Sequence, residues 1–255
     1  MLLKIRTYFF LFLLIATFQV MAQNEAITEP QLQYMKRIQW GMNLNSTGLG
    51  GVNFKYGWHK TGRVNDMIDI EFARVRHSKE TRIYSTASDN PRQYTFGRLN
   101  MAFFLRTGYG QNIAITERPY KNAASLHFNY SIGVTTAILK PCYLDIKKII
   151  PDKSGGPSYV IVVPEKYDPL VHTDQTVIMG NSSFTTGLDQ LTFSAGGYGK
   201  ASLAVEWGPY PDEFKSLEAG VVFDTFLNPL PLMAFVPKDY YFAQLFIEFT
   251  FGSNR

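Results

Sequence analysis

Hydrophobic and polar residues alternate with a period of two through most of the chain after residue 37. In the segment 126–136, for example, Leu, Phe, Tyr, Ile and Val alternate with His, Asn, Ser, Gly and Thr. Such alternation places the apolar side chains on one face of a β-strand and the polar side chains on the other. The same pattern occurs in eight segments, which are 38–45, 52–59, 68–73, 98–106, 126–136, 201–207, 217–224 and 241–251. The sequence therefore predicts an all-β protein with eight antiparallel strands.

Alternation of this kind is typical both of a soluble β-sandwich and of a transmembrane β-barrel. Two details favour the barrel. The polar face is rich in Gly, Ser, Asn and charged residues, as the interior of a barrel requires, and large aromatic residues lie near the strand ends, as in the aromatic girdles at membrane interfaces. The residues predicted to form such a girdle are Trp40, Tyr56, Trp58, Trp207 and Tyr241.

The N-terminal segment 1–22 has the features of a secretory signal peptide. Lys4 and Arg6 precede an apolar run over residues 8–18, and cleavage is expected after Ala22. No apolar stretch after residue 23 is long enough for a transmembrane helix. We expect a short periplasmic segment over 23–37, a barrel over 38–251, and a C-terminal tail over 252–255. The predicted location is the cell outer membrane, as an integral protein.

The connections between the predicted strands differ in length. With both termini in the periplasm, the short periplasmic turns are expected at 59–67, 107–123 and 208–216, and the external loops at 74–97, 137–199 and 226–240. Because the long loop 137–199 is rich in apolar residues, we expect it to be partly structured. Strand-like runs are expected at Tyr143 to Ile150 and Tyr159 to Val163, and a short helix at Ser183 to Leu191. This loop either covers the barrel mouth or binds an outer-membrane protein partner.

Composition narrows the remaining function classes. The chain has 255 residues, with 25 Lys and Arg against 21 Asp and Glu, and this weak positive balance argues against nucleic acid as a partner. A single cysteine excludes an internal disulfide framework and any zinc site built from cysteines. Glu165, Asp168, His172 and Asp174 match the spacing of no standard metal site, so no metal or cofactor is predicted.

The closing segment Tyr241 to Phe251 resembles the final-strand signal that the barrel-assembly machinery reads during biogenesis. The residues that carry this assembly signal are Tyr241, Leu245, Ile247, Phe249 and Phe251, although Gly252 to Arg255 follow where many such proteins end. With the eight alternating segments, the chain resembles small eight-stranded outer-membrane barrels of Gram-negative bacteria. The composition, rich in aromatic residues and asparagine, is similar to that of outer-membrane proteins of Bacteroidota-type bacteria. The resemblance implies a barrel fold and no specific activity.

Eight strands enclose an interior that side chains can fill. The charged residues predicted to face it are Lys55, Asp69, Glu71, Arg98, Arg106, Lys200, Glu206, Glu218, Asp224 and Glu248. Because unpaired buried charges are costly, these side chains are expected to form a structural salt-bridge plug. A narrow ion pathway and a catalytic carboxylate pair are the alternatives.

Some eight-stranded barrels are lipid-modifying enzymes, and a lipid A deacylase of this kind has a His and a Ser two residues apart. Here no serine stands two residues after His127, and His127 is expected to point inward. We therefore predict a protein that is not an enzyme. Arg74 and Arg76 interrupt the apolar face at the outer end of the third strand, where a basic rim would meet the phosphates of lipopolysaccharide.

The predicted function is that of a non-enzymatic integral outer-membrane barrel acting as a structural or interaction subunit. The alternatives are an accessory subunit of an outer-membrane assembly, export or uptake complex, a lipid-modifying enzyme, and a narrow channel. The expected partners are outer-membrane lipid and lipopolysaccharide, the barrel-assembly machinery, and a protein bound through the loop 137–199.

Overall fold

The computed structural model of this chain describes residues 36–87, 92–116, 124–151, 158–208 and 213–255. The predicted signal peptide and nearly all of the segment 23–37 lie outside the described residues. Within the described part of the chain, no helix is long and apolar enough to span a membrane.

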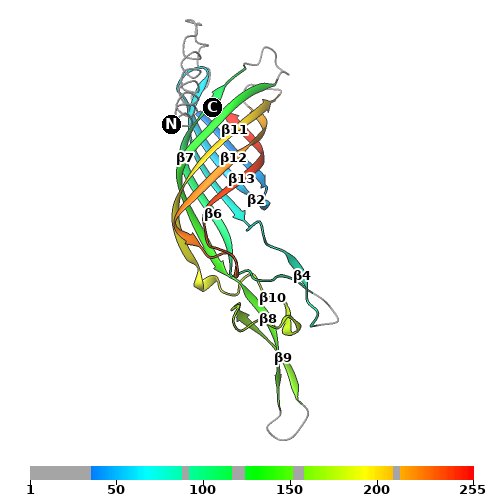
Figure 1. The fold of residues 1–255 in the computed structure, drawn as a ribbon. Helices are drawn as coiled ribbons and strands as arrows, with labels where there is room; N and C mark the ends of the chain where they lie inside the picture. Colours follow the sequence, from blue (N-terminus) through cyan, green and yellow to red (C-terminus); the bar gives the residue numbers. More distant parts are fainter. Residues whose placement is uncertain (1–35, 88–91, 117–123, 152–157, 209–212) are drawn as a thin grey trace, which may run out of the picture. The chain divides into compact units, whose positions relative to one another are not determined.

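Eight long strands close into an antiparallel barrel (Figure 1). Each strand pairs with its neighbour along the chain, and the first strand closes the ring by pairing with the last. Each of the eight segments predicted from the alternation overlaps one of these strands, so the predicted fold class is confirmed. The barrel strands are β1 (Lys36–Asn45), β2 (Gly48–His59), β3 (Val64–Val75), β6 (Asn100–Ala114), β7 (Ser125–Pro141), β11 (Thr192–Trp207), β12 (Glu213–Leu230) and β13 (Asp239–Asn254).

The alternation of the sequence becomes an alternation of burial in the barrel wall. Along β13, Gln244 and Glu248 face the interior and are buried, whereas Leu245 and Ile247 face outward and are more than half exposed. The wall therefore has an apolar outer surface and a polar inner surface, the reverse of a water-soluble barrel with an apolar core.

The two ends of the barrel differ in their connections. The start of β1, the end of β13 and the connections after β2, β6 and β11 lie at one end, which we call the turn end. The connections after β1, β3, β7 and β12 lie at the other, which we call the loop end. The β1–β2 connection is a tight turn at Ser46 and Thr47, and the other three connections at the loop end are long.

Several predicted boundaries are wrong because the strands are longer than their alternating segments. The expected loop 137–199 is reduced to 142–191, since β7 continues to Pro141 and β11 begins at Thr192. The expected turn 107–123 begins only after Ala114. Strands also occupy most of the expected tail 252–255 and residues 36–37 of the expected periplasmic segment, because Asn254 pairs with Arg37. Likewise, the expected loop 226–240 shrinks to 231–238.

Two glycines inside the longer strands have a packing role, and one of them, Gly108, lies in the segment expected to be a turn. Gly108 and Gly133 are directly paired in β6 and β7, and Tyr198 of β11 is the next residue in the same row. A β-carbon at Gly108 would lie 2.4 Å from the Tyr198 hydroxyl. These glycines therefore make room inside the barrel for a large ring, and they do not end the strands.

The connection between β7 and β11 contains a second, three-stranded sheet in the order β10-β8-β9, made of β8 (Tyr143–Ile150), β9 (Tyr159–Lys166) and β10 (Ile178–Asn181). Both strand-like runs predicted here are strands, and β9 continues through Pro164. The helix expected from Ser183 is wrong: this stretch forms turns and a short 3-10 helix, η2 (Leu188–Gln190). A second 3-10 helix, η1 (Gln175–Val177), precedes β10.

The three long connections at the loop end share one hydrophobic core, and we call them together the loop module (residues 76–99, 142–191 and 231–238). The β3–β6 connection contributes the small hairpin of β4 (Arg82–Tyr84) and β5 (Gln93–Thr95). Backbone hydrogen bonds join the connections, as where Cys142 N donates to Leu99 O and Leu99 N donates to Leu232 O. The buried residues of the shared core are Tyr94, Cys142, Leu144, Ile146, Tyr167, Ile178 and Ala234.

Candidate functional site

Charged side chains inside the barrel form ion pairs that follow one another along the barrel axis. Nearest to the turn end, Arg37 pairs with Glu206. In the next layer, Lys55 Nζ lies 2.7 Å from a carboxylate oxygen of Glu218 and 2.9 Å from one of Glu248. Lys55 is 2 % exposed and Glu248 is fully buried, so these charges depend on each other for compensation.

Two more basic residues continue this network toward the loop end. Lys200 Nζ lies 2.8 Å from Glu71, 3.2 Å from Glu248 and 3.9 Å from Asp69. The Arg106 guanidinium lies 2.5 Å from Glu71 and 2.7 Å from Asp224. All six carboxylates predicted to face the interior are therefore within 4 Å of a basic side chain, as a structural salt-bridge plug requires.

The prediction that Arg98 belongs to this network is wrong. Because β6 begins at Asn100, Arg98 lies in the loop module, where its guanidinium is 3.6 Å from Glu80 and 3.4 Å from Asn181 Oδ1. The error has a local cause, since the alternating pattern of 98–106 continues two residues beyond the end of the strand. The other nine predicted charges all lie inside the barrel.

Sequence reasoning missed Arg37 as a member of the network. Arg37 is in phase with the inward-facing Gln39, so extending the alternation of the first segment by one residue would have found it. Its guanidinium also lies over the Phe214 ring, 3.9 Å from the ring centroid.

A serine–histidine pair also lies inside the barrel near the turn end. Ser125 Oγ is 2.9 Å from His127 Nε2, and His127 Nδ1 is 3.0 Å from Asn112 Oδ1. Glu206 is 3.3 Å from the same Nε2 atom. The serine stands two residues before the histidine in the sequence, so the spacing of Ser after His that the sequence analysis considered does not include it. Both side chains are buried in the barrel interior and so face away from the membrane.

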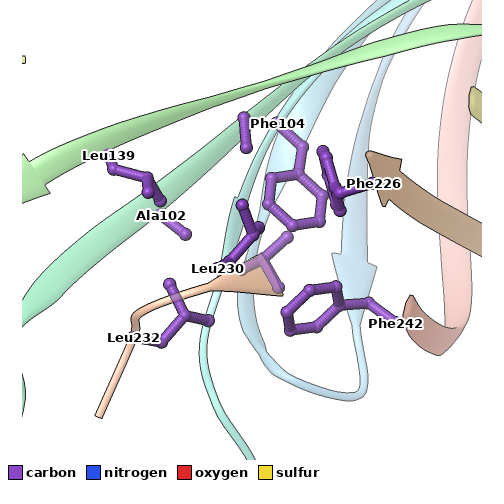
Figure 2. Packing of buried hydrophobic residues seen from close by; sticks show 9 residues of the cluster. Ala102, Phe104, Leu139, Phe226, Leu230, Leu232 and Phe242 are labelled. Carbon is purple, nitrogen blue, oxygen red and sulfur yellow. The ribbon is translucent and has the colours of Figure 1, made fainter. Parts of the chain in front are cut away.

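An apolar cluster fills the barrel interior at the loop end, beyond the last ion pair (Figure 2). The Phe104 ring is fully buried and packs edge-on against Phe226 and Phe242, at centroid distances of 4.9 and 5.4 Å. Leu230, the last residue of β12, and Leu232, just after it, pack on the same cluster. We call this cluster the apolar plug. It adds an apolar seal above the ion pairs, where the alternation alone predicted a polar interior.

Aromatic side chains surround the outside of the barrel near both ends. The predicted girdle residues Trp40, Tyr56, Trp58 and Trp207 lie in the half toward the turn end, and Tyr241 lies toward the loop end. Tyr109 joins them, with its ring centroid 6.3 Å from that of Trp58. The five residues predicted as the assembly signal form the outward face of β13: Tyr241, Leu245, Ile247, Phe249 and Phe251.

The four residues considered for metal binding are divided between two places. Glu165 is 3.2 Å from His172 Nε2, and Asp168 contacts the same histidine through its backbone. Asp174 caps η1 through Thr176. Hydrogen bonds from Lys148 and His172 hold the pKa of Glu165 below its usual value. Over the described ranges, no group of His, Cys, Asp or Glu is arranged to hold a metal ion.

Comparison with known proteins gives similarity of architecture alone. No family model and no curated protein matches the sequence. The Neisserial surface protein A structure is 9 % identical and has a TM-score of 0.38, covering 87 % of this chain and 96 % of its own. The Yersinia pestis attachment invasion locus protein Ail is 11 % identical with a TM-score of 0.38, covering 88 % and 100 %. The barrel assignment of the present chain rests on its own strand pairing.

Proposed function

We propose that this protein is an integral outer-membrane β-barrel that acts as a non-enzymatic structural or interaction subunit, with the loop module as its contact surface. The observation that carries the proposal is the inverted polarity of the barrel: ion pairs inside and a continuous apolar surface outside. Met42, Ile132 and Leu245, for example, are exposed on the outer wall by 72, 71 and 64 %. A lipid bilayer is the environment in which such a wall is stable.

The filled interior supports a structural role over transport. Four layers of ion pairs and the apolar plug occupy the barrel, so a narrow channel is disfavoured. The buried Ser125–His127 pair likewise faces away from lipid, which disfavours the lipid-modifying enzyme.

The loop module supports an interaction role. The three connections are folded around a common core and joined by hydrogen bonds, which a simple covering for the barrel mouth does not require. An accessory subunit of a larger outer-membrane assembly, export or uptake complex is the more specific form of this proposal.

Lipid contact follows from the same arrangement. Arg74 and Arg76 continue the outward face of β3 beyond Phe72, whose ring stacks on Phe103 at 5.7 Å. Cations just beyond an aromatic band are placed to meet the phosphates of lipopolysaccharide. The outward face of β13 is the surface offered to the barrel-assembly machinery during biogenesis.

Cysteine labelling of whole cells tests the membrane location and the orientation. A membrane-impermeant maleimide is expected to label a Tyr159→Cys variant in intact cells, because Tyr159 is 54 % exposed in the loop module. A Lys60→Cys variant, in the turn after β2, should react only after the outer membrane is opened. The native Cys142 is 1 % exposed, so the unmodified protein should not react with the maleimide and serves as the background control. Labelling of Lys60→Cys in intact cells would show that the proposed orientation is wrong.

Shortening the β8–β9 hairpin tests the interaction role. Ile146 pairs directly with Val163, so residues 147–162 can be replaced by an Asn-Gly turn that joins two opposed residues. Because Leu144, Ile146 and Ile178 remain, the core of the loop module is kept. The shortened protein is expected to fold and to stay heat-modifiable in SDS gels, while surface cross-links to a partner disappear. If every cross-link persists, the contact surface lies elsewhere.

A further inference from the structure

One face of the outer half of the β8–β9 hairpin carries exposed apolar side chains. β10 pairs with β8 only as far as Ile146, so from Lys147 onward the hairpin consists of two strands. Ile149, Val160 and Val162 lie on one face and are 67, 53 and 47 % exposed. On the barrel wall such exposure is explained by lipid, but the hairpin belongs to the loop module. An apolar two-stranded ribbon in water is marginally stable by itself and marks a binding surface.

The backbone of β9 presents unpaired groups along its outer edge. Tyr167 N donates to Cys142 O over 2.9 Å, in the same register as the β8–β9 ladder. In an antiparallel ladder, hydrogen-bonded residues alternate with residues whose N–H and C=O point away. Val160, Val162 and Pro164 therefore direct their backbones outward. Pro164 lacks an N–H and stands where an edge strand tolerates proline.

No other strand of the described residues covers this edge, because the sheet order β10-β8-β9 ends there. The edge offers the N–H and C=O of two consecutive outward-facing residues and ends at Pro164. Such an edge is complementary to an extended peptide.

The charges beside the edge select the occupant. Lys148 pairs with Glu165, and Asp145 pairs with Arg92 over 3.0 Å. Lys147 and Lys166 share the face of Val160 and Val162 by strand alternation, and neither has an acidic partner within 4 Å among the described residues. Two lysines without an acidic partner therefore lie beside the apolar side chains of this face, and an acidic side chain of a bound segment would compensate their charge.

We propose that the free edge of β9 binds an extended segment of a partner protein by strand addition. The segment places apolar side chains opposite Val160 and Val162 and an acidic side chain opposite Lys166, on the same face. A second copy of β9 brings another lysine and no acid to this face, so a partner segment fits better. The inference rests on the proposed function and gives the interaction a defined geometry.

Synthetic peptides test the proposal on the full chain in nanodiscs. Two fluorescent peptides are used, one designed to pair with β9 in the parallel direction and one in the antiparallel direction. In each peptide, every second residue is threonine. The residues between the threonines are two valines to lie opposite Val160 and Val162, a serine opposite Pro164 and a glutamate opposite Lys166. At least one is expected to bind. Val162→Pro, which removes an outward N–H but no bond to β8, should weaken binding about tenfold, the effect of one lost hydrogen bond. Val162→Thr keeps the N–H and is the matched control, with a much smaller effect.

Charge reversal and amide exchange locate the bound peptide. Lys166→Glu should weaken binding of the peptide with glutamate opposite residue 166 and strengthen binding of a peptide with lysine in place of that glutamate. The amides of Val160 and Val162 should exchange rapidly in the free protein and slowly in the complex. The amide of Ile161, bonded to β8, should be protected in both.

Three results would overturn the inference: no binding of either peptide at millimolar concentration, equal binding by Val162→Pro, or protection elsewhere in the chain. Self-association that Val162→Pro abolishes would identify a second copy as the occupant. In cells, Val162→Pro should lose the same cross-links as the shortened hairpin. If only the shortened hairpin loses them, the strand-addition inference fails and the proposed function stands. If the shortened hairpin loses none, the proposed function fails.

Discussion

Replacing Glu248 by leucine is expected to destabilise the barrel by about 3–5 kcal/mol, the effect of leaving buried charges without a partner. Glu248 is fully buried and contacts both Lys55 and Lys200, so its removal affects two layers of the network at once. Among the described residues, Lys55 would then keep the carboxylate of Glu218, and Lys200 would keep those of Glu71 and Asp69. The variant should lose its heat-modifiable form in SDS at a lower temperature and refold with lower yield.

The neighbouring Ile247 gives a matched control on the same strand. Ile247 faces outward and is 54 % exposed, so Ile247→Leu should leave stability nearly unchanged. Glu248→Gln keeps the shape of the side chain and one hydrogen-bond acceptor. Its stability should lie between those of Glu248→Leu and Ile247→Leu. If the Glu248→Leu protein folds as well as Ile247→Leu but conducts ions, the charged interior is an ion pathway and not a structural plug.

Replacing Phe104 by alanine is expected to cost about 3–5 kcal/mol, the usual effect of removing a buried aromatic side chain. Phe104 is fully buried and packs on the rings of Phe226 and Phe242 in the apolar plug. The measurement is urea unfolding of the refolded barrel in detergent or lipid. Leu105→Ala is the control, because Leu105 is 38 % exposed on the outer wall, where lipid can fill the space.

The Phe104→Ala and Leu105→Ala variants also test whether the apolar plug blocks ion flow, separately from its contribution to stability. Planar-bilayer recordings should show no steady openings for the native protein or for Phe104→Ala, because the ion-paired layers still fill the interior. If steady conductance appears only in Phe104→Ala, the apolar plug alone blocks ion flow through the barrel, and the ion-paired layers do not. Equal stability of Phe104→Ala and Leu105→Ala would contradict the packing described for the plug.

The number of barrel strands and the orientation of most side chains could be predicted from the sequence. Both follow from local geometry, because successive side chains of a strand point to opposite faces wherever the strand lies. Lys55, Glu218 and Glu248 were placed inside the barrel on this basis, although Lys55 lies more than 160 positions from either carboxylate along the chain. The strand ends were less predictable. Gly108, for example, is typical of a turn until its pairing with Gly133 and the neighbouring Tyr198 ring are seen.

The alternation is a property of the local sequence, and it already shows which face of each strand points outward and which residues share the interior. Which charges pair, the position of Arg98 outside the barrel, and the meeting of the three phenylalanine rings in one plug become visible once the strands are assembled. The tertiary structure likewise decided that Ile146 is buried, whereas Val160 and Val162 stand at an open edge. The physical reason is that alternation depends on one strand, whereas ion pairing, plug packing and edge exposure depend on neighbouring strands distant in sequence.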